Sequence, residues 1–310
     1  MVVVINYANE LYRQSQIMCT AAAYHFGADK VWEYSPQNIP PEFYQAHKAI
    51  LDQPRGNGYW LWKPLIILDA LSKVDEGDYV FYIDSGATLC DDIHLLVNAM
   101  NADNANIMTF VCPGATEKTW TKRDAFILMD CDAPEYTDTD QLASGFEIFK
   151  KSAESIAFVE EWLRYMTDAR IVTDIPNQLG QPNYPEFMEN RHDQSVLSLL
   201  AKKKKLPLFR TPSSPHSTAG YPEDVLARSP YPLIIDTNRR RNWTMTLDEY
   251  LKLNSKRTTA PRGLECVCVL MVEKFYSEAL KMLLHLMSRS PLVARGGGLG
   301  RTEGSAPSDE

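Results

Sequence analysis

The sequence predicts an α/β fold in which helices flank a mixed, mostly parallel central sheet. Residues 2–5 and 30–34 have the composition of strands, and residues 11–26 between them show helical spacing that ends at Gly27. A strand, a helix and a second strand in succession favour parallel pairing. The third observation is residues 79–83, which are apolar at every position, as in a strand buried on both faces.

Similar patterns predict the remaining elements. Helices are expected from Pro41, from Pro64 through residue 71, and over residues 93–100, 155–166, 196–201 and 246–253. Strands are expected over residues 107–111, 144–150 and 233–235. Residues 1–253 are therefore assigned to one main domain and residues 254–294 to a C-terminal helical extension, with an amphipathic helix at 275–287. Residues 295–310, rich in Gly, Ser and Pro, are expected to be a disordered tail.

Charge and cysteine content narrow the class of protein. The chain has 310 residues and a formal net charge of −8 at pH 7, so nucleic acid is not an expected partner. Its six cysteines show no metal-ligand spacing, and a reducing compartment suits them. The N-terminus becomes polar too soon for a signal peptide, and no apolar run approaches the roughly 20 residues of a transmembrane helix. We expect a cytoplasmic protein without a membrane span, and peripheral membrane attachment stays open.

Asp84 stands directly after the apolar run 79–83, with small residues following it. In an open α/β sheet, ligands bind beyond the carboxyl ends of the strands. A carboxylate at that point can bind a hard divalent cation together with a diphosphate. The alternative is that Asp84 only caps the following turn.

An aromatic and cationic segment precedes this strand. Residues 55–64 read RGNGYWLWKP, so that Trp60 and Trp62 lie between Arg55 and Lys63. One interpretation is a floor for a base or sugar, with the two cations neutralising phosphates. The other is a packed loop wedged under a helix.

The order of Asp84, an acidic residue at a helix start (Asp193) and a late histidine (His216) resembles the GT-A family of nucleotide-sugar-dependent glycosyltransferases. Four blocks are similar, more narrowly, to small glycosyltransferases of polysaccharide and glycan assembly. They are residues 58–64 (GYWLWKP), 82–86 (YIDSG), 120–123 (WTKR) and 192–195 (HDQS). The resemblance covers about residues 1–250. It implies a GT-A-like, Rossmann-type fold that transfers a sugar from a nucleoside-diphosphate sugar to a hydroxyl of a glycan acceptor.

The resemblance also implies roles for individual residues. Asp193 is the candidate base and His192 its alternative, while Asp84 and His216 are the candidate ligands of Mn²⁺ or Mg²⁺. The residues expected at the donor are Asn6, Tyr7, Arg55, Trp60, Trp62, Lys63, Asp84, Ser85, Lys122 and Arg123. The residues expected at the acceptor are Ser144, Gly145, Phe146 and Glu147.

The sequence departs from the family pattern at Gly86, which stands where a second carboxylate is usual. Asp91 or Asp92 could supply it, or the enzyme could be independent of metal, with Arg and Lys neutralising charge. Asp130 and Asp132 match the DxD pattern literally, but we interpret them as part of an exposed acidic loop. The arginines of residues 239–241 are either a clamp for phosphate or acceptor, or a solvated basic loop.

Three of these residues or runs also have a purely structural interpretation, and two other functions are compatible with the sequence. Asp193 could be a helix cap, His216 an exposed loop residue, and the lysines of residues 202–205 a solvated helix end. The chain could also be a non-catalytic sugar-nucleotide or glycan-binding protein on a degenerate glycosyltransferase fold. A nucleotidyltransferase or phosphatase is less well supported, because the sequence has no P-loop.

Overall fold

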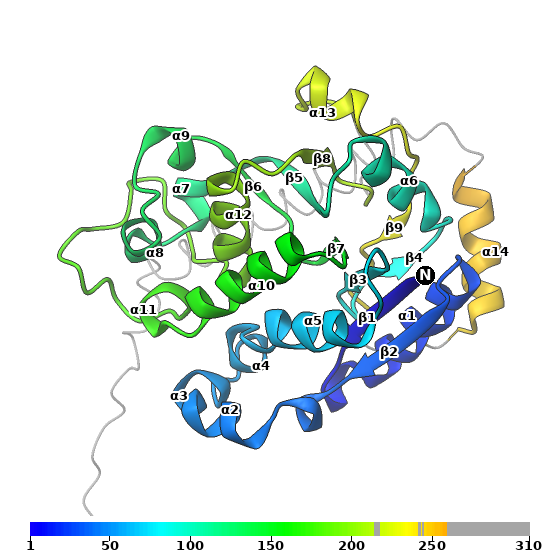
Figure 1. The fold of residues 1–310 in the computed structure, drawn as a ribbon, viewed down its shortest axis with the longest axis horizontal. Helices are drawn as coiled ribbons and strands as arrows, with labels where there is room; N and C mark the ends of the chain where they lie inside the picture. The colour runs from blue at the N-terminus through cyan, green and yellow to red at the C-terminus, as the bar shows by residue number, and fades with distance from the viewer. Residues whose placement is uncertain (214–217, 241–242, 244, 259–310) are drawn as a thin grey trace, which may run out of the picture. The chain divides into compact units, whose positions relative to one another are not determined.

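A seven-stranded sheet runs through the part of the chain that the structure describes (Figure 1). The structure is a computed structural model, and it describes residues 1–213, 218–240, 243 and 245–258. Residues Met1–Ser255 form one compact unit. The strands follow the order β2-β1-β3-β7-β5-β6, and β8 pairs with β5. Their bounds are β1 Val2–Tyr7, β2 Lys30–Tyr34, β3 Tyr79–Ile83, β5 Ile107–Thr116, β6 Asp140–Leu142, β7 Phe146–Lys150 and β8 Leu208–Arg210.

The sheet is mixed and mostly parallel, which confirms the coarse prediction from the sequence. β1 pairs in parallel with both β2 and β3, and β5 pairs in parallel with β8. Only β6 and β7 run against their neighbours. The strand predicted over residues 144–150 begins later, at Phe146, because Gly145 turns the chain so that its carbonyl accepts the backbone N–H of Asp84 at 2.7 Å.

Apolar side chains cover both faces of the central strands, as the continuous apolar runs predicted. Val3, Ile5, Val80 and Tyr82 pack into one core with helices α5 (Trp62–Lys73), α10 (Ala153–Met166) and α12 (Asp193–Lys203). The intervening residues of β1 and β3 pack into a second core with α1 (Arg13–His25) and α6 (His94–Ala102). α5 and α10 lie side by side over the first face (Figure 1).

The shorter elements differ most from the sequence-based expectations. The helix expected over residues 11–26 is divided into η1 (Glu10–Tyr12) and α1, and the strand expected at residues 233–235 is β9 (Ile235–Asp236), antiparallel to β4 (Thr88–Leu89). The Pro-rich stretch before it holds two elements that were not predicted, β8 and α13 (Glu223–Ala227). The remaining helices of the described chain are η2 Pro36–Asn38, α2 Pro41–Ala46, α3 Lys48–Leu51, α4 Gly56–Tyr59, α7 Glu117–Trp120, α8 Arg123–Leu128, α9 Pro134–Thr137, α11 Ala169–Val172 and α14 Leu247–Thr258. The predicted extension beyond residue 258, the tail and His216 lie outside the described residues.

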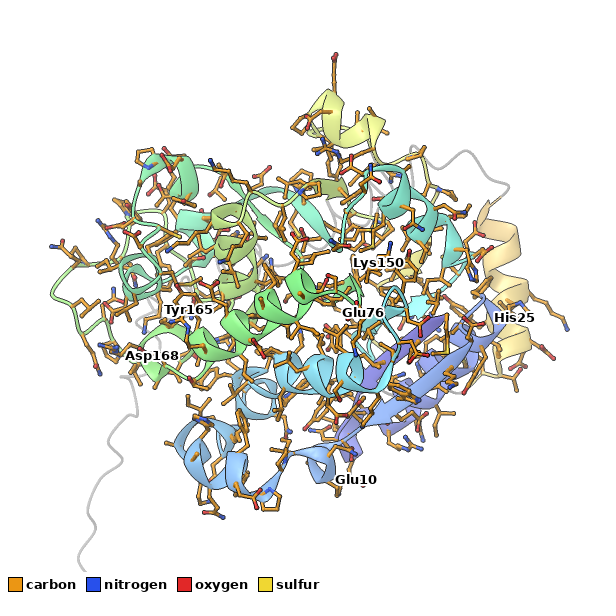
Figure 2. All side chains as sticks on the ribbon, viewed as in Figure 1. Glu10, His25, Glu76, Lys150, Tyr165 and Asp168 are labelled. Carbon is orange, nitrogen blue, oxygen red and sulfur yellow. The ribbon has the colours of Figure 1, made fainter. Side chains whose placement is uncertain are left out.

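Register brings the carboxyl ends of three neighbouring strands to one edge of the sheet. Tyr7 at the end of β1 pairs with Tyr34 at the end of β2, and β3 ends at Ile83 on the other side of β1. Glu10, just after β1, therefore lies at the opposite edge from Glu76 and Lys150, which lie near the start of β3 and at the end of β7 (Figure 2). Asp84 belongs to the same edge as Glu10, where α/β sheets bind ligands.

A left-handed turn precedes α5. Five consecutive residues, Gly56 to Trp60, have positive φ angles between 51° and 94°. Left-handed conformation costs roughly 1–2 kcal/mol per residue without glycine, so the surroundings must hold the turn. The side-chain amide of Asn57 donates to the Tyr7 hydroxyl, and the Trp62 indole donates to the Gly56 carbonyl at 3.0 Å. The segment thus anchors the end of β1 to the start of α5.

Gly58→Ala should destabilise the protein by about 2–4 kcal/mol, because an added Cβ would lie 2.7 Å from the Cα atom of Leu51 at a φ of +94°. Gly77→Ala is the matched control: Gly77 also has positive φ (+85°), but nothing lies within 4 Å of its Cβ position. Urea unfolding of both variants measures the difference. Equal losses would show that Leu51 does not restrict the turn.

Candidate functional site

Four ionisable side chains meet beneath the carboxyl end of β3. Asp84 follows β3, Glu147 lies on β7 opposite Tyr82, Lys63 is in the first turn of α5, and Asp193 is the first residue of α12. Strands and helices that are far apart in sequence therefore bring three carboxyl groups around one ammonium group. We refer to Lys63, Asp84, Glu147 and Asp193 as the charge cluster.

Lys63 is the centre of the charge cluster. Its side chain is 2% exposed, and its Nζ atom lies 2.5 Å from Asp193 Oδ2, 3.7 Å from Asp84 Oδ1 and 2.5 Å from the Ser144 carbonyl to which it donates. Burial alone lowers the pKa of this lysine, but the carboxylates of Asp193 and Asp84 hold it above its ordinary value. The surroundings of Lys63 therefore favour its charged form, although the side chain is buried.

Asp84 is the member of the charge cluster that remains open to solvent. Its side chain is 44% exposed, against 5% for Asp193. The Tyr82 hydroxyl donates to Oδ1, whereas Oδ2 faces Gly145, where an added Cβ would lie 3.3 Å away. Partial burial raises the pKa of Asp84, and both Lys63 and the Tyr82 hydrogen bond oppose that rise. A larger residue than glycine at position 145 would thus crowd the Oδ2 atom of Asp84.

Glu147 is fully buried, and neither of its carboxyl oxygens has a hydrogen-bond partner among the described residues. Burial raises its pKa well above the ordinary value; Lys63 opposes the rise, while Asp84 and Asp193 add to it. The environment therefore favours the protonated, neutral form of this side chain. With Glu147 neutral, the charge cluster holds one cation and two anions.

The four cations expected at the donor phosphates are all engaged by the protein itself. Lys63 is held in the charge cluster, and the other three make contacts with acidic side chains or backbone carbonyls. Those partners are Asp174 and Glu189 for Arg55, the carbonyls of Thr173 and Ile175 for Lys122, and Asp132 for Arg123. Asp132 is thus part of an ion pair, while Asp130 is 97% exposed at its side chain, as the exposed-loop interpretation implied.

The side chains expected to face the donor lie mostly in packed positions. The Tyr7 and Trp62 rings stack with centroids 3.6 Å apart, and Asn6 is buried and accepts from the Gln16 amide. Ser85 donates to the Tyr7 carbonyl at 2.7 Å, which ties the Asp84 turn to the end of β1. These residues support the edge of the sheet from below.

His192 is buried between the left-handed turn and α11. Its Nδ1 atom lies 2.7 Å from the Val172 carbonyl, and its ring contacts those of Tyr59 and Trp60. Its Nε2 atom has no hydrogen-bond partner among the described residues and lies 3.8 Å from Asp174 Oδ1. Burial lowers its pKa, so the imidazole favours its neutral form.

The four residues expected at the acceptor differ in their relation to the charge cluster. The Ser144 carbonyl holds Lys63, Gly145 faces Asp84, and Glu147 is part of the cluster. Phe146 points to the other face of the sheet, where its ring contacts that of Phe110.

A pocket of about 580 Å³ lies at the same edge of the sheet, beyond the ends of β1 and β2. It is lined by residues 8–11, Arg13 and Gln16 of α1, and residues 33–37. The side-chain oxygen of Asn9 is buried there without a hydrogen-bond partner among the described residues. The volume is within the range of small-molecule sites.

The sequence did not predict that two arginines, Arg191 and Arg239, belong to the same part of the molecule. Arg191 lies two residues before Asp193, and its guanidinium packs 3.8 Å from the Trp120 ring centroid. The backbone N–H of Arg239 donates to the Gly86 carbonyl at 2.8 Å. Arg191 directly precedes the 192–195 block, and Arg239 belongs to the basic run already noted. Only the fold shows that Arg239 lies beside Gly86, two residues after Asp84, and that its charge acts on Arg191.

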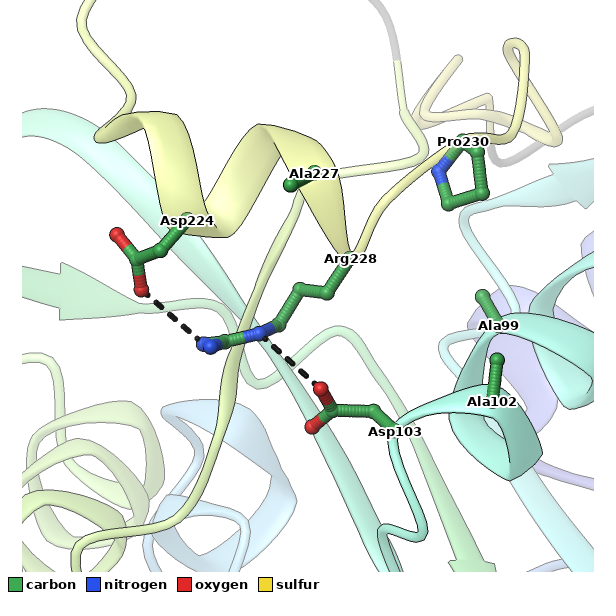
Figure 3. Close-up of a pocket in the computed structure, with 7 residues that line it drawn as sticks. All are labelled: Ala99, Ala102, Asp103, Asp224, Ala227, Arg228 and Pro230. Carbon is green, nitrogen blue, oxygen red and sulfur yellow. Dashed lines mark ion pairs between the residues drawn. The ribbon is translucent and has the colours of Figure 1, made fainter.

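A second pocket, of about 390 Å³, lies between α6 and α13 (Figure 3). Arg228 in its wall makes ion pairs with Asp103 and Asp224. Asp103 follows α6 and precedes β5, so this pocket belongs to the opposite edge of the sheet from Asp84. Because its one cation is neutralised by the protein, it offers no chemistry comparable with that of the charge cluster.

The described donor set does not fit a resident divalent cation. Among these residues, no group of three or more His, Cys, Asp or Glu side chains could hold a metal ion. At Asp84 the nearest charged neighbour is the Lys63 ammonium, and Asp193 is buried in an ion pair with it. The predicted Mn²⁺ or Mg²⁺ site stays a prediction, since His216 is outside the described residues.

Comparisons with known proteins give no indication of the function of this chain. A scan against protein-family models finds no match for this chain, and a search of the curated proteins finds none either. Within the described residues, no helix combines the length and the apolar character that crossing a bilayer requires.

Lys63→Met should destabilise the protein by about 3–5 kcal/mol, because it leaves Asp193 buried without a counter-charge. The double variant Lys63→Met/Asp193→Asn should regain part of this loss. Urea unfolding of the single and double variants gives the coupling free energy. Strictly additive losses would contradict a buried ion pair.

Glu147→Gln should become more stable relative to the parent as the pH rises above about 4, the ordinary range of a glutamate pKa. Above that pH the unfolded parent releases the Glu147 proton while the folded parent retains it, so the stability of the parent falls. Glutamine has no such proton. Free energies of unfolding between pH 4.5 and 8 test this, with exposed Glu160→Gln as the control. A difference that stays constant with pH would be the contrary result.

Proposed function

We propose that the chain is a GT-A-type glycosyltransferase, which transfers a sugar from a nucleoside-diphosphate sugar to a hydroxyl of a glycan acceptor. One observation carries the proposal: a pocket of about 580 Å³ beyond β1 and β2 shares an edge of the sheet with the open carboxylate of Asp84 after β3. β1 is the direct neighbour of β3, so the two features lie on adjoining strand ends. A nucleotide spanning them would bring its sugar to Asp84.

The nucleoside would occupy the pocket beyond β1 and β2. The buried, unpartnered oxygen of Asn9 suits an N–H donor of a base or a hydroxyl of the ribose. The diphosphate would then extend past Ser85 toward Asp84. This path follows the Ser85–Tyr7 hydrogen bond that joins the two strand ends.

Asp84 is the carboxylate that we assign to the reacting sugar. The sequence favoured Asp193 as the base, but its side chain is 5% exposed and its Oδ2 atom lies 2.5 Å from Lys63. Asp193 and Lys63 therefore act as positioning residues, which fix the orientation of Asp84 from below.

A non-catalytic sugar-nucleotide-binding protein is the second candidate. It is favoured by the burial of Asp193 against Lys63, which leaves the charge cluster with one accessible carboxylate. Such a protein would bind a nucleotide sugar without transferring or hydrolysing the sugar.

Thermal shift with a panel of nucleoside diphosphates, with and without Mn²⁺, is the first test. At least one should raise the melting temperature, because a ligand that binds only the folded state stabilises it. The absence of any shift across the panel would reject both candidates.

Asp84→Asn should lower the turnover of the best nucleotide sugar by at least about 100-fold, as expected for a group that acts on developing charge. Asp75→Asn, at an exposed position before β3, is the matched control and should retain activity. Release of the nucleoside diphosphate measures turnover. Binding without turnover in the parent protein would favour the second candidate.

A further inference from the structure

Among the described residues, none of the four cations expected at the donor leaves its charge free for a diphosphate beside Asp84. Lys63 is neutralised by Asp193 and Asp84, and Arg55, Lys122 and Arg123 are held elsewhere by the protein. Asp84 itself adds negative charge. A pyrophosphate group at this edge would be repelled unless another cation faced it.

Arg191 and Arg239 are two further cations in the described part of the chain. Neither side chain forms an ion pair with a carboxylate in the part of the chain that the structure describes. Arg191 is held against the Trp120 ring, and its backbone N–H donates to the Trp120 carbonyl at 3.0 Å. The Arg239 backbone is fixed on Gly86, two residues after Asp84. Arg239 therefore lies close to Asp84 in the segment after β9, and Arg191 lies two residues before Asp193, the first residue of α12.

The two guanidinium groups also influence each other. Burial lowers the pKa of Arg191; Cys112 and Glu189 oppose this effect, and the charge of Arg239 lowers the pKa further. Glu189 is itself paired with Arg55 at 2.8 Å. Two arginines that repel each other, with no carboxylate bound to either, form an arrangement that an anion between them would stabilise.

We propose that Arg191 and Arg239 bind the diphosphate of the donor and neutralise its charge, so that donor binding and turnover do not require a divalent cation. The inference rests on the proposed function, because it takes the nucleoside-diphosphate sugar as the ligand. It adds the residues and the charge-neutralising mechanism. Guanidinium groups suit this task because they donate two parallel hydrogen bonds to phosphate oxygens.

The reaction then balances without a metal. The bond between the anomeric carbon and the terminal phosphate oxygen breaks, and its electron pair stays on that oxygen. The acceptor oxygen bonds to the anomeric carbon, and its proton passes to Asp84. The two guanidinium groups stabilise the negative charge that the released nucleoside diphosphate gains.

Calorimetry of the full chain with the nucleoside diphosphate that gives the largest thermal shift provides the test. After treatment with EDTA, the dissociation constant should change by less than about threefold. Arg191→Gln and Arg239→Gln should each weaken binding by tenfold or more, in line with the loss of hydrogen bonds to a charged group. The nucleoside without phosphates should bind all variants equally. Arg164→Gln, on the exposed side of α10, is the matched control.

The outcomes separate the inference from the function on which it rests. If no nucleoside diphosphate binds with or without Mn²⁺, the proposed function itself is rejected. If binding requires Mn²⁺ and survives both arginine substitutions, the function stands and the arginine site is rejected. Arg191→Gln keeps a side chain against Trp120, and the exposed Arg239 provides a second variant if Arg191→Gln unfolds.

Discussion

The buried ammonium of Lys63 is the constraint on which the rest of the site depends. It joins α5 to α12 through Asp193, to β3 through Asp84, and to the turn before β7 through the Ser144 carbonyl. A charge with 2% exposure is tolerated only because these acceptors surround it. The same contacts fix where each of the four segments begins or ends, so the site and the fold share one set of interactions.

The contacts around Lys63 also give the three carboxyl groups of the charge cluster different surroundings. Asp193 is saturated by Lys63, Glu147 is held where its neutral form is favoured, and Asp84 keeps an accessible oxygen. Three similar side chains thus acquire three different properties from burial and from distance to one cation. Within the charge cluster, the chemistry available to a ligand is that of the single accessible carboxylate of Asp84.

The left-handed turn before α5 contributes to the same arrangement. It connects the end of β1 to the start of α5 through Tyr7 and Trp62, and it places Tyr59 and Trp60 against His192. The glycines in RGNGYWLWKP make this path possible, and the aromatic residues fill the space between β1, α5 and α12. The aromatic segment is therefore a support for the site, with its rings in packing contacts.

The sequence by itself determined the parallel pairing of β1 with β2 and the burial of β3 on both faces. Continuous apolar runs at β1 and β3 and the strand–helix–strand order were enough, because burial on both faces and parallel crossover leave direct patterns along the chain. The same patterns placed Asp84 at a strand end. Short elements such as β8 and α13 escaped prediction, since a few residues carry little periodic signal.

Only the tertiary structure decided which charges are free. Lys63, Arg55, Lys122 and Arg123 look like phosphate ligands in sequence, but each meets an acceptor in the folded chain, which for the first three comes from a distant segment. Arg191 and Arg239 are 48 residues apart by their numbers and come to one edge only through the contacts of Trp120 and Gly86. The charge state and availability of a side chain depend on partners that are remote in sequence, and no local pattern specifies those partners.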